Sequence, residues 1–186
     1  MTRIEPLLER NALIAADYTP APLGVPTAQA VILSCLDHRL PPEIFLGLET
    51  GEAPVIRNAG GRVTPAVIQD VAFLAFLAEE LFGGTAAPGA SLFEVAVIHH
   101  TQCGTGFLGD AAFRRQAARA TGLSEDTLAS SVVDDPVTTV REDVDRLLSA
   151  PQVSAKVSVS GHVYDVETGR VTTVLDARHP QPAGNN

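Results

Sequence analysis

The stretch AVILSC at residues 30–35 and the stretch LFEVAVIHH at residues 92–100 decide the fold of this chain. Short continuous apolar runs of this kind are typical of strands that are buried on both faces of a parallel sheet. A third run, APVIRNAGG at residues 53–61, leads into a glycine turn. We therefore predict neighbouring parallel strands, and active sites in such sheets lie beyond the carboxyl ends of the strands.

Helical patterns lie between and around these strands. The expected helices cover residues 1–18, residues 41–48, a segment from Pro65 to Leu81, residues 107–122 and residues 136–148. Residues 83–90 are expected to form a loop. Residues 156–176 alternate in two runs around Glu167-Thr168-Gly169, which predicts a strand, a turn and an antiparallel strand. Strands that alternate with helices indicate an α/β fold, with a mostly parallel sheet flanked by helices and a C-terminal antiparallel strand.

The length of 186 residues suits a single domain, which we expect to span residues 1–186. Residues 1–26 are expected to form its N-terminal helical arm and linker. Apolar residues at helical spacing come first in this segment, and Pro20, Pro22 and Pro26 follow. The apolar share of 45% and the charged share of 19% are those of a globular protein, so wholesale disorder is excluded.

The charge balance excludes several classes of partner. Thirteen Lys and Arg residues against 22 Asp and Glu residues give a net charge of −9, so we expect neither a nucleic-acid partner nor an anionic membrane partner.

Charges interrupt the N-terminal segment, and no apolar stretch is long enough to span a bilayer, so we expect no signal peptide and no membrane helix. The expected location is the cytoplasm, where Cys35 and Cys103 would stay reduced.

Three residues of metal-binding type follow the predicted strands. Cys35 ends one strand, and His100 ends another, with Cys103 three residues later. Thiolate and imidazole ligands suit zinc, and three protein ligands leave free the fourth position that a catalytic zinc ion keeps open. The alternative is two buried structural cysteines beside a core histidine, and the spacing alone leaves both interpretations open.

Asp37 and Arg39 follow the first of these cysteines. Residues two apart on a strand face the same way, so the Asp37 carboxylate could either reach a metal or pair with Arg39. A carboxylate that exchanges between the two would gate the open coordination position. A surface salt bridge, which is worth little energetically, is the alternative explanation of the same pair.

Together these segments resemble the β-class carbonic anhydrases. The resemblance rests on Cys35-x-Asp37-x-Arg39, Arg57-Asn58-Ala59-Gly60-Gly61 and His100-x-x-Cys103-Gly104, in this order and at this spacing. The short chain and the brief C-terminal hairpin look like the small branch of the class, which also includes carbonyl sulfide hydrolases.

The resemblance implies a site and an assembly. Zn2+ would be held by Cys35, His100 and Cys103, and Asp37 with Arg39 would form the catalytic dyad. The implied substrate pocket consists of Arg57, Asn58, Ala59, Gly60, Gly61 and Gly104, with the turn contributing through its backbone. No cofactor other than zinc is expected. The family forms dimers or multiples of dimers, so we expect a homodimer or a tetramer, with the N-terminal arm on the partner subunit.

The activity that the resemblance implies is the reversible hydration of CO2 to bicarbonate by a zinc-bound hydroxide, gated by the dyad. The protein would then be a zinc lyase. Hydrolysis of carbonyl sulfide or carbon disulfide at the same site is the alternative enzymatic activity. The sequence separates the lyase from the hydrolase poorly, because the width of the pocket and the polarity of its entry channel decide between them. A catalytically inactive, zinc-stabilised binding domain is the alternative from another class.

Several further residues are interpreted without a ligand role. His99 precedes a predicted ligand, and strand alternation turns it to the opposite face of the sheet, where a core histidine is expected. Residues 104–109 match the G-x-G-x-x-G fingerprint of dinucleotide sites, but the residues that follow are helical and polar rather than a second strand. Thr105 stands where many relatives have glycine and, like His38, could alter substrate choice.

Overall fold

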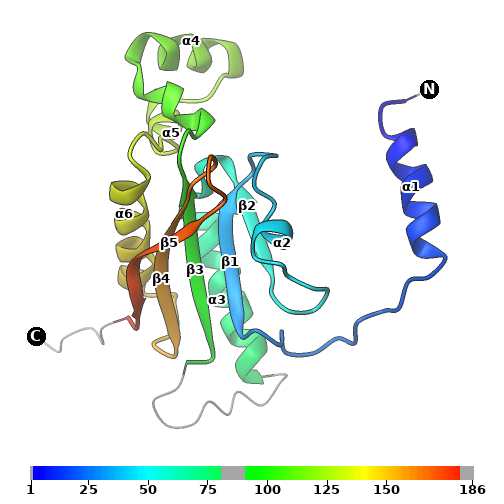
Figure 1. Ribbon diagram of the computed structural model, residues 1–186. Coiled ribbons are helices and arrows are strands. Elements are labelled where there is room, and N and C mark those ends of the chain that lie inside the picture. Colours follow the sequence, from blue (N-terminus) through cyan, green and yellow to red (C-terminus); the bar gives the residue numbers. More distant parts are fainter. Residues whose placement is uncertain (1, 81–90, 181–186) are drawn as a thin grey trace, which may run out of the picture.

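The computed structural model describes residues 2–80 and 91–180. Its centre is a five-stranded sheet with the order β2-β1-β3-β4-β5 (Figure 1). The strands are β1 (Ala30–Cys35), β2 (Val55–Asn58), β3 (Phe93–His100), β4 (Val157–Tyr164) and β5 (Val171–Arg178). The first four strands run parallel to their neighbours, and β5 runs antiparallel to β4. The predicted mostly parallel sheet with a C-terminal antiparallel strand is thereby confirmed.

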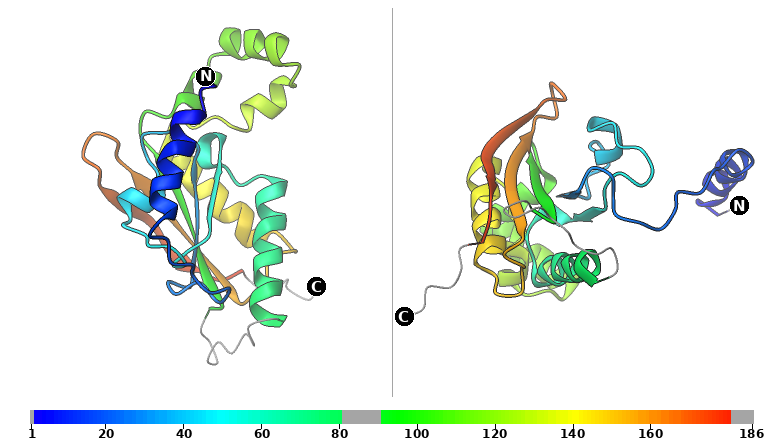
Figure 2. Two further views of the ribbon diagram at one scale, coloured as in Figure 1. Left: turned by 90° about the vertical axis from the view of Figure 1, so that its right-hand side faces the viewer. Right: turned by 90° about the horizontal axis from the view of Figure 1, so that it is seen from below.

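Helices cover one face of the sheet and the region beyond its carboxyl edge. The helices of the main body are α2 (Pro42–Phe45), α3 (Pro65–Glu80), α4 (Ala111–Thr121), α5 (Glu125–Ala129) and α6 (Pro136–Ser149). α3 and α6 pack on the same face, whereas α4 and α5 lie beyond the end of β3 (Figures 1 and 2). On the other face, the ring of Phe45 in α2 lies 4.6 Å from that of Tyr164 in β4, centroid to centroid.

The main core fills the space between the sheet and α3 and α6. It forms because both helices have apolar residues at a spacing that places them on one side. The buried helix residues are Val67, Val71 and Ala75 from α3 and Val140, Val144 and Leu147 from α6. They pack against Val95 and Val97 of β3, which are fully buried. Burial of each Val or Leu side chain stabilises the fold by roughly 1.5–3 kcal/mol.

Gly161 in β4 permits the close packing of α6. A Cβ atom at this position would lie 3.0 Å from Cγ2 of Val144 and 3.3 Å from Cγ2 of Val140. Any larger residue would push α6 away from the sheet, because close-packed cores have no spare volume. Asp135 fixes the start of the same helix, since its carboxylate accepts a hydrogen bond of 3.0 Å from the backbone N–H of Val137.

The strand and glycine turn predicted for residues 53–61 are confirmed, because β2 ends at Asn58 and Ala59–Gly61 form a 3-10 turn in which Gly60 has a φ of 79°. One predicted boundary is wrong. The helix predicted for residues 107–122 begins only at Ala111, because the glycine-rich segment Gly104–Gly109 is a 3-10 helix and glycine disfavours α-helix. The Asp110 side chain then caps α4. The loop predicted for residues 83–90 lies outside the described residues.

The N-terminal helix α1 (Glu5–Ala15) stands away from the rest of the chain (Figure 1 and the right-hand view of Figure 2). None of its residues, all of which are described, is buried. The exposed apolar side chains around it are Ile4, Leu7, Leu8, Leu13 and Ile14. The predicted helical arm is thus confirmed. Within residues 2–80 and 91–180, the helices are too short or too polar to cross a membrane.

Candidate metal centre

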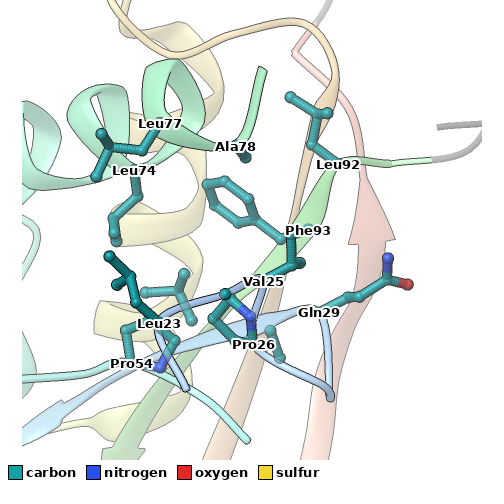
Figure 3. A pocket seen from close by; sticks show the side chains of 13 residues that line it. Leu23, Val25, Pro26, Gln29, Pro54, Leu74, Leu77, Ala78, Leu92 and Phe93 are labelled. Carbon is teal, nitrogen blue, oxygen red and sulfur yellow. The ribbon is translucent and has the colours of Figure 1, made fainter. Parts of the chain in front are cut away.

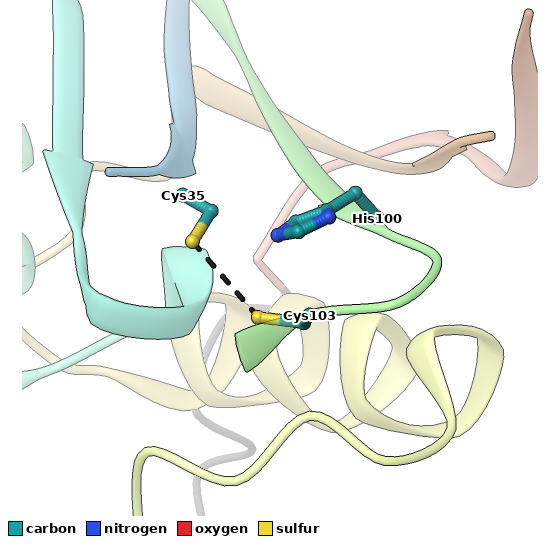
Figure 4. Close-up of side chains that lie close together, drawn as sticks. All are labelled: Cys35, His100 and Cys103. Carbon is teal, nitrogen blue, oxygen red and sulfur yellow. Dashed lines mark hydrogen bonds between the residues drawn. The ribbon is translucent and has the colours of Figure 1, made fainter. Parts of the chain in front are cut away.

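Two adjacent parallel strands bring the predicted ligands together. Cys35 is the last residue of β1, His100 is the last residue of β3, and Cys103 follows a short turn after β3. β1 and β3 pair directly, so their carboxyl ends meet at one edge of the sheet. The ligand atoms of the three residues all lie within 4.8 Å of one another (Figure 4). All three residues are buried, so the cluster is part of the folded interior and not a chance surface grouping.

The imidazole of His100 presents one nitrogen to this cluster. Its Nδ1–H donates a hydrogen bond of 2.9 Å to the backbone carbonyl of Thr101, which leaves the lone pair of the neutral ring on Nε2. Nε2 is buried and has no hydrogen-bond partner among the described residues. Figure 4 shows the ring turned toward the two sulfur atoms. A buried nitrogen without a partner, facing two thiols, is what a metal ligand provides.

The two thiols form a coupled pair. The Sγ atoms of Cys35 and Cys103 lie 3.9 Å apart and share a hydrogen bond. This hydrogen bond lowers the pKa of Cys103, and the same hydrogen bond raises the pKa of Cys35. Two thiolates bound to one tetrahedral zinc ion, with Zn–S bonds of 2.3 Å, would be separated by about 3.8 Å. The spacing and the donor set therefore fit zinc, with one coordination position left free of protein ligands.

Asp37 and Arg39 pair beside the ligands, in the loop after β1. Nη2 of Arg39 donates to Oδ2 of Asp37 at 2.6 Å, and Nε donates to Oδ1 at 3.0 Å. These hydrogen bonds from Arg39 hold the pKa of Asp37 well below its usual range. Asp37 and Arg39 do not lie on a strand, as the predicted alternation required, because β1 ends at Cys35, but the predicted pairing exists. Asp37 is thus a fixed anion next to the candidate metal ligands.

Arg57 supports this loop through its side chain. It lies in β2 beside β1, and its Nε donates a hydrogen bond of 2.9 Å to the carbonyl of Cys35. Its Nη2 donates another, of 2.7 Å, to the carbonyl of Asp37. The turn at residues 57–61 is expected from the sequence to contribute through its backbone. The guanidinium of Arg57 additionally fixes the backbone of the loop at Cys35 and at Asp37.

The glycine turn after β2 packs tightly against β1. Gly61 has a φ of +66°, and a Cβ atom there would lie 2.9 Å from the carbonyl carbon of Ser34. The turn is closed by the Asn58 side chain, which exchanges hydrogen bonds of 2.8 and 2.9 Å with the backbone of Arg62. This contact explains why the turn is rich in glycine: it must approach the strand that ends in Cys35.

A cavity of about 340 Å³ opens onto the ligands. It is lined by Cys35, Leu36, Asp37, His38, Ala59, Cys103, Gly104 and Thr105. Of the pocket residues expected from the sequence, Ala59 and Gly104 therefore line the cavity. The other expected pocket residues do not line the cavity and belong to the structure that supports its wall. They are Arg57, Asn58, Gly60 and Gly61.

A second cavity, of about 380 Å³, lies at the opposite edge of the sheet (Figure 3). Its walls come from the linker before β1, the end of α3 and the first residues of β3. Apolar side chains dominate these walls, among them Leu23, Val25, Leu74, Leu92 and Phe93. It has a similar volume to the first cavity but no group of converging polar side chains, so its chemistry does not make it a candidate active site.

Gln102 and Glu167 are contacts that the sequence analysis missed. Gln102 has a φ of 53°, and its carbonyl accepts a hydrogen bond of 2.9 Å from Nη2 of Arg39. Its side-chain Nε2 donates to Oε1 of Glu167, in the turn between β4 and β5, at 2.6 Å. Both are ordinary polar loop residues in the sequence, so no pattern could have linked them. The β4–β5 turn thereby holds the loop between His100 and Cys103 against Arg39.

His99 is confirmed on the opposite face of β3, in a buried polar network. Its Nδ1 donates a hydrogen bond of 2.8 Å to Oγ1 of Thr139, whose hydroxyl in turn donates to a carbonyl in the α6 cap. Its Nε2 lies 3.2 Å from Oδ2 of Asp143, a contact without the alignment of a hydrogen bond. Asp143 also accepts hydrogen bonds of 2.7 Å from both Arg62 and Arg146.

Two further histidines lie outside the candidate site. His162 contacts Ser160 at 2.8 Å, and His179 contacts Ser91 at 3.3 Å. The Gly104–Gly109 segment leads into α4, and the acidic Glu125 after it starts α5 and does not close a second strand. The dinucleotide fingerprint therefore lacks the strand that such a site requires.

Comparisons with known proteins agree with this geometry. A family model described as carbonic anhydrase matches residues 30–109. Beta-carbonic anhydrase 1 of Mycobacterium tuberculosis is 33% identical over 175 residues, which cover 94% of this chain and 99% of that protein. A carbon disulfide hydrolase of Saccharolobus solfataricus is 28% identical over 172 residues, which cover 80% of this chain and 78% of that protein.

The crystal structure of a carbonic anhydrase from Streptococcus mutans is similar to the whole fold. The two structures superpose with a TM-score of 0.74 at 31% sequence identity, and the match covers 94% of this chain and 98% of that chain. Sequence, fold and the cluster of two cysteines and a histidine thus agree over nearly the full length, and the chain belongs to the β-carbonic anhydrase family.

Proposed function

We propose that this chain is a zinc-dependent carbonic anhydrase that hydrates CO2 to bicarbonate. One observation carries the proposal: two thiols and the Nε2 of a buried imidazole converge, and both thiols line the same cavity as a carboxylate that is held by an arginine. Three protein ligands with one free position are the arrangement of a catalytic zinc site rather than a structural one.

Cys35, His100 and Cys103 would hold the zinc ion. When bound, zinc supplies a water molecule that ionises near neutral pH and so provides the nucleophile for CO2. The contact between Nδ1 of His100 and the carbonyl of Thr101 keeps Nε2 available as a ligand. Ligand thiols must stay reduced, which fits the cytoplasmic location that we expect.

Asp37 would orient the nucleophile. Its low pKa keeps the carboxylate ionised, so it accepts hydrogen bonds and does not donate them. By accepting a hydrogen bond at one carboxylate oxygen, it would point the nucleophile's lone pair toward CO2. Arg39 holds Asp37 at the edge of the cavity, and Arg39 is itself held by the carbonyl of Gln102. The dyad thus keeps Asp37 available as an acceptor instead of a competing metal ligand.

Hydrolysis of carbon disulfide or carbonyl sulfide is the second candidate. The observation that favours it is the carbon disulfide hydrolase among the relatives, although the identity to the carbonic anhydrase relative is higher. The same ligands, carboxylate and cavity would serve either reaction. The carbonic anhydrase assignment is preferred because that relative is matched over 99% of its length.

We also propose a homodimer or a tetramer built from it. The support is α1, which exposes Leu7, Leu8 and Ile14 and buries none of its residues. An exposed apolar stripe on an isolated helix lacks a covering surface in a single chain. A second copy of the chain would supply that surface. Sedimentation of the full chain should give a dimer or tetramer, and deletion of residues 1–18 should shift it toward the monomer.

The function is tested by stopped-flow CO2 hydration on zinc-loaded protein, across about pH 7 to 9, where zinc-bound water ionises. Fast turnover supports the carbonic anhydrase. Turnover of carbon disulfide or carbonyl sulfide alone, with CO2 inert, identifies the hydrolase. A protein that binds zinc stoichiometrically and turns over none of the three substrates is a zinc-stabilised binding domain, and the catalytic proposal is then wrong.

A further inference from the structure

The two thiols of the metal centre have different neighbours. Sγ of Cys103 lies 3.1 Å from Oγ1 of Thr105, a hydrogen-bond distance for sulfur and a hydroxyl. Cys35 is approached by backbone groups of Asp37 and Gly60, and by Cys103, but by no hydroxyl among these contacts. One of the two metal-binding sulfurs thus has a side-chain hydrogen-bond partner of its own.

The local backbone explains how Thr105 reaches the sulfur. Cys103 is extended, with φ −68° and ψ 132°, and the 3-10 helix Gly104–Gly109 begins immediately after it. The first turn of this helix folds the chain back, so that the hydroxyl two residues on returns to the cysteine. Gly104, between them, has open space around its Cβ position, so the turn does not depend on a packing contact there.

The direction of this hydrogen bond follows from the ligand role. A cysteine that binds a metal is a thiolate and carries no proton to donate. The Thr105 hydroxyl must therefore be the donor and the Cys103 sulfur the acceptor. Hydrogen bonds to a ligand atom tune the metal that the ligand holds.

Two thiolates donate more electron density to a zinc ion than neutral ligands do, which opposes the ionisation of a bound water. A hydrogen bond to one sulfur withdraws part of that density. We propose that Thr105 is a positioning residue of the proposed zinc site, which tunes the donor strength of the Cys103 thiolate through its hydroxyl. This inference rests on the proposed zinc-binding function but not on which substrate is turned over.

The test compares three proteins loaded with Co2+ in place of zinc. Thr105→Val replaces the hydroxyl with a methyl group of nearly the same size, and Thr105→Ser keeps the hydroxyl and removes the methyl group. Loss of the hydrogen bond raises the energy of the sulfur lone pair. The sulfur-to-cobalt charge-transfer band of Thr105→Val should therefore move to longer wavelength, whereas Thr105→Ser should keep the wild-type band.

Zinc-loaded forms of the same variants provide the second readout. Thr105→Val should lose about 10-fold in turnover at neutral pH, the lower end of the range for partners of metal ligands, and Thr105→Ser should retain most of it. Thr105→Ala removes the hydroxyl as well and replaces Thr105→Val if that variant does not fold.

Identical charge-transfer bands in the wild type and Thr105→Val would overturn the proposal. So would an equal shift in Thr105→Val and Thr105→Ser, because the missing methyl group and not the hydroxyl would then be the cause. The band is read without substrate. A shifted band in a protein that is inactive toward CO2 would therefore contradict the proposed activity and leave the role of Thr105 intact, and failure of the wild type to bind Co2+ would contradict the metal site itself.

Discussion

His99 and His100 are neighbours on β3 with side chains that are equally inaccessible to solvent, yet they face different surroundings. His99 points toward α6, where Thr139 and Asp143 contact its two nitrogens at 2.8 and 3.2 Å. His100 points to the other side, where Nδ1 is bound by a carbonyl and Nε2 faces two thiols without a hydrogen bond.

The difference shows that burial alone does not separate a structural histidine from a metal ligand, whereas the groups that contact the two ring nitrogens do. The ring of His99 contacts the hydroxyl of Thr139 and the carboxylate of Asp143, which hold α6 to the sheet. That carboxylate also binds two arginines. The ring of His100 has one nitrogen fixed and the other left for a group from outside the chain. We therefore expect the surroundings of His99 to serve stability and those of His100 to serve the proposed chemistry.

Separate replacement of the two histidines should give the largest difference in zinc content and activity. His100→Ala removes a ligand, so zinc content should fall below one equivalent and CO2 hydration should fall to background. His99→Ala should keep stoichiometric zinc but lower the midpoint of urea unfolding, because it removes buried contacts to α6. Metal analysis, stopped-flow assays and urea titrations measure these effects. Full zinc content and activity in His100→Ala would refute the ligand assignment.

Asp143→Asn should show the largest loss of stability. The carboxylate is fully buried and pairs with Arg62, whose side chain is 6% exposed. Removal of one partner of a buried ion pair costs about 3–5 kcal/mol. The Arg62 charge would stay buried and would keep the half-exposed carboxylate of Glu142, 3.2 Å away, as its ion-pair partner. Urea unfolding measures this loss. Asp145→Asn is the matched control, since that carboxylate is 69% exposed and pairs with an exposed arginine, and it should change stability by about 0.5 kcal/mol or less.

Asp37→Ala should affect the chemistry and spare the fold. The variant should keep one equivalent of zinc but lose about 100-fold in kcat, the lower end of the range for a positioned carboxylate that acts on a proton. Asp70→Ala, which removes an exposed carboxylate from α3, is the control and should keep wild-type turnover. Wild-type turnover in Asp37→Ala would refute the dyad.

The stability of the buried network should depend on pH in a defined direction. Burial alone would raise the pKa of Asp143, but contacts with His99 and Arg62 outweigh it and hold that pKa below the usual value of an Asp carboxyl. The stability from this charge is therefore present above that value and is lost as pH falls through the lower folded pKa. The contribution is at most about 1.4 kcal/mol per pH unit for one proton.

Urea unfolding at intervals from about pH 5 to pH 3 covers the range in which an Asp carboxylate titrates. The wild type should lose stability more steeply than Asp143→Asn. Parallel slopes in the two proteins would show that Asp143 does not carry this pH dependence.

Glu167→Ala should have the smallest effect. It removes the hydrogen bond that holds Gln102, whose carbonyl in turn holds Arg39. Loss of one exposed hydrogen bond is worth about 1 kcal/mol, so kcat should fall roughly five-fold at unchanged zinc content. Glu167→Gln keeps an acceptor oxygen at the same place and should restore most of the turnover. Equal turnover in all three proteins would show that the β4–β5 turn does not position Arg39.

The proposed metal centre is easier to predict from the sequence than the buried network around His99. Cys35 and His100 end apolar runs, and parallel strands bring their carboxyl ends together, so the meeting of these residues follows from local patterns. The network of Arg62, Asp143 and His99 cannot be found that way, because Arg62 and Asp143 are 81 residues apart and meet only when α6 packs on the sheet. The contact between Gln102 and Glu167 also depends on tertiary packing.

The error in the predicted helix start has a related cause. Residues 107–110 are expected from the sequence to open a helix, but Phe107–Gly109 belong to a glycine-rich 3-10 helix that begins at Gly104. That turn places the Thr105 hydroxyl beside the Cys103 sulfur, a contact that depends on the local backbone geometry as well as on the residue type.

The separation of the ligands along the chain has a consequence for biosynthesis. Cys35 and Cys103 are 68 residues apart, and they meet only because β3 lies next to β1. During translation, a nascent chain that has not yet reached residue 103 contains only one of the two thiols. The complete set of three proposed ligands therefore exists only after more than half of the polypeptide has been synthesised.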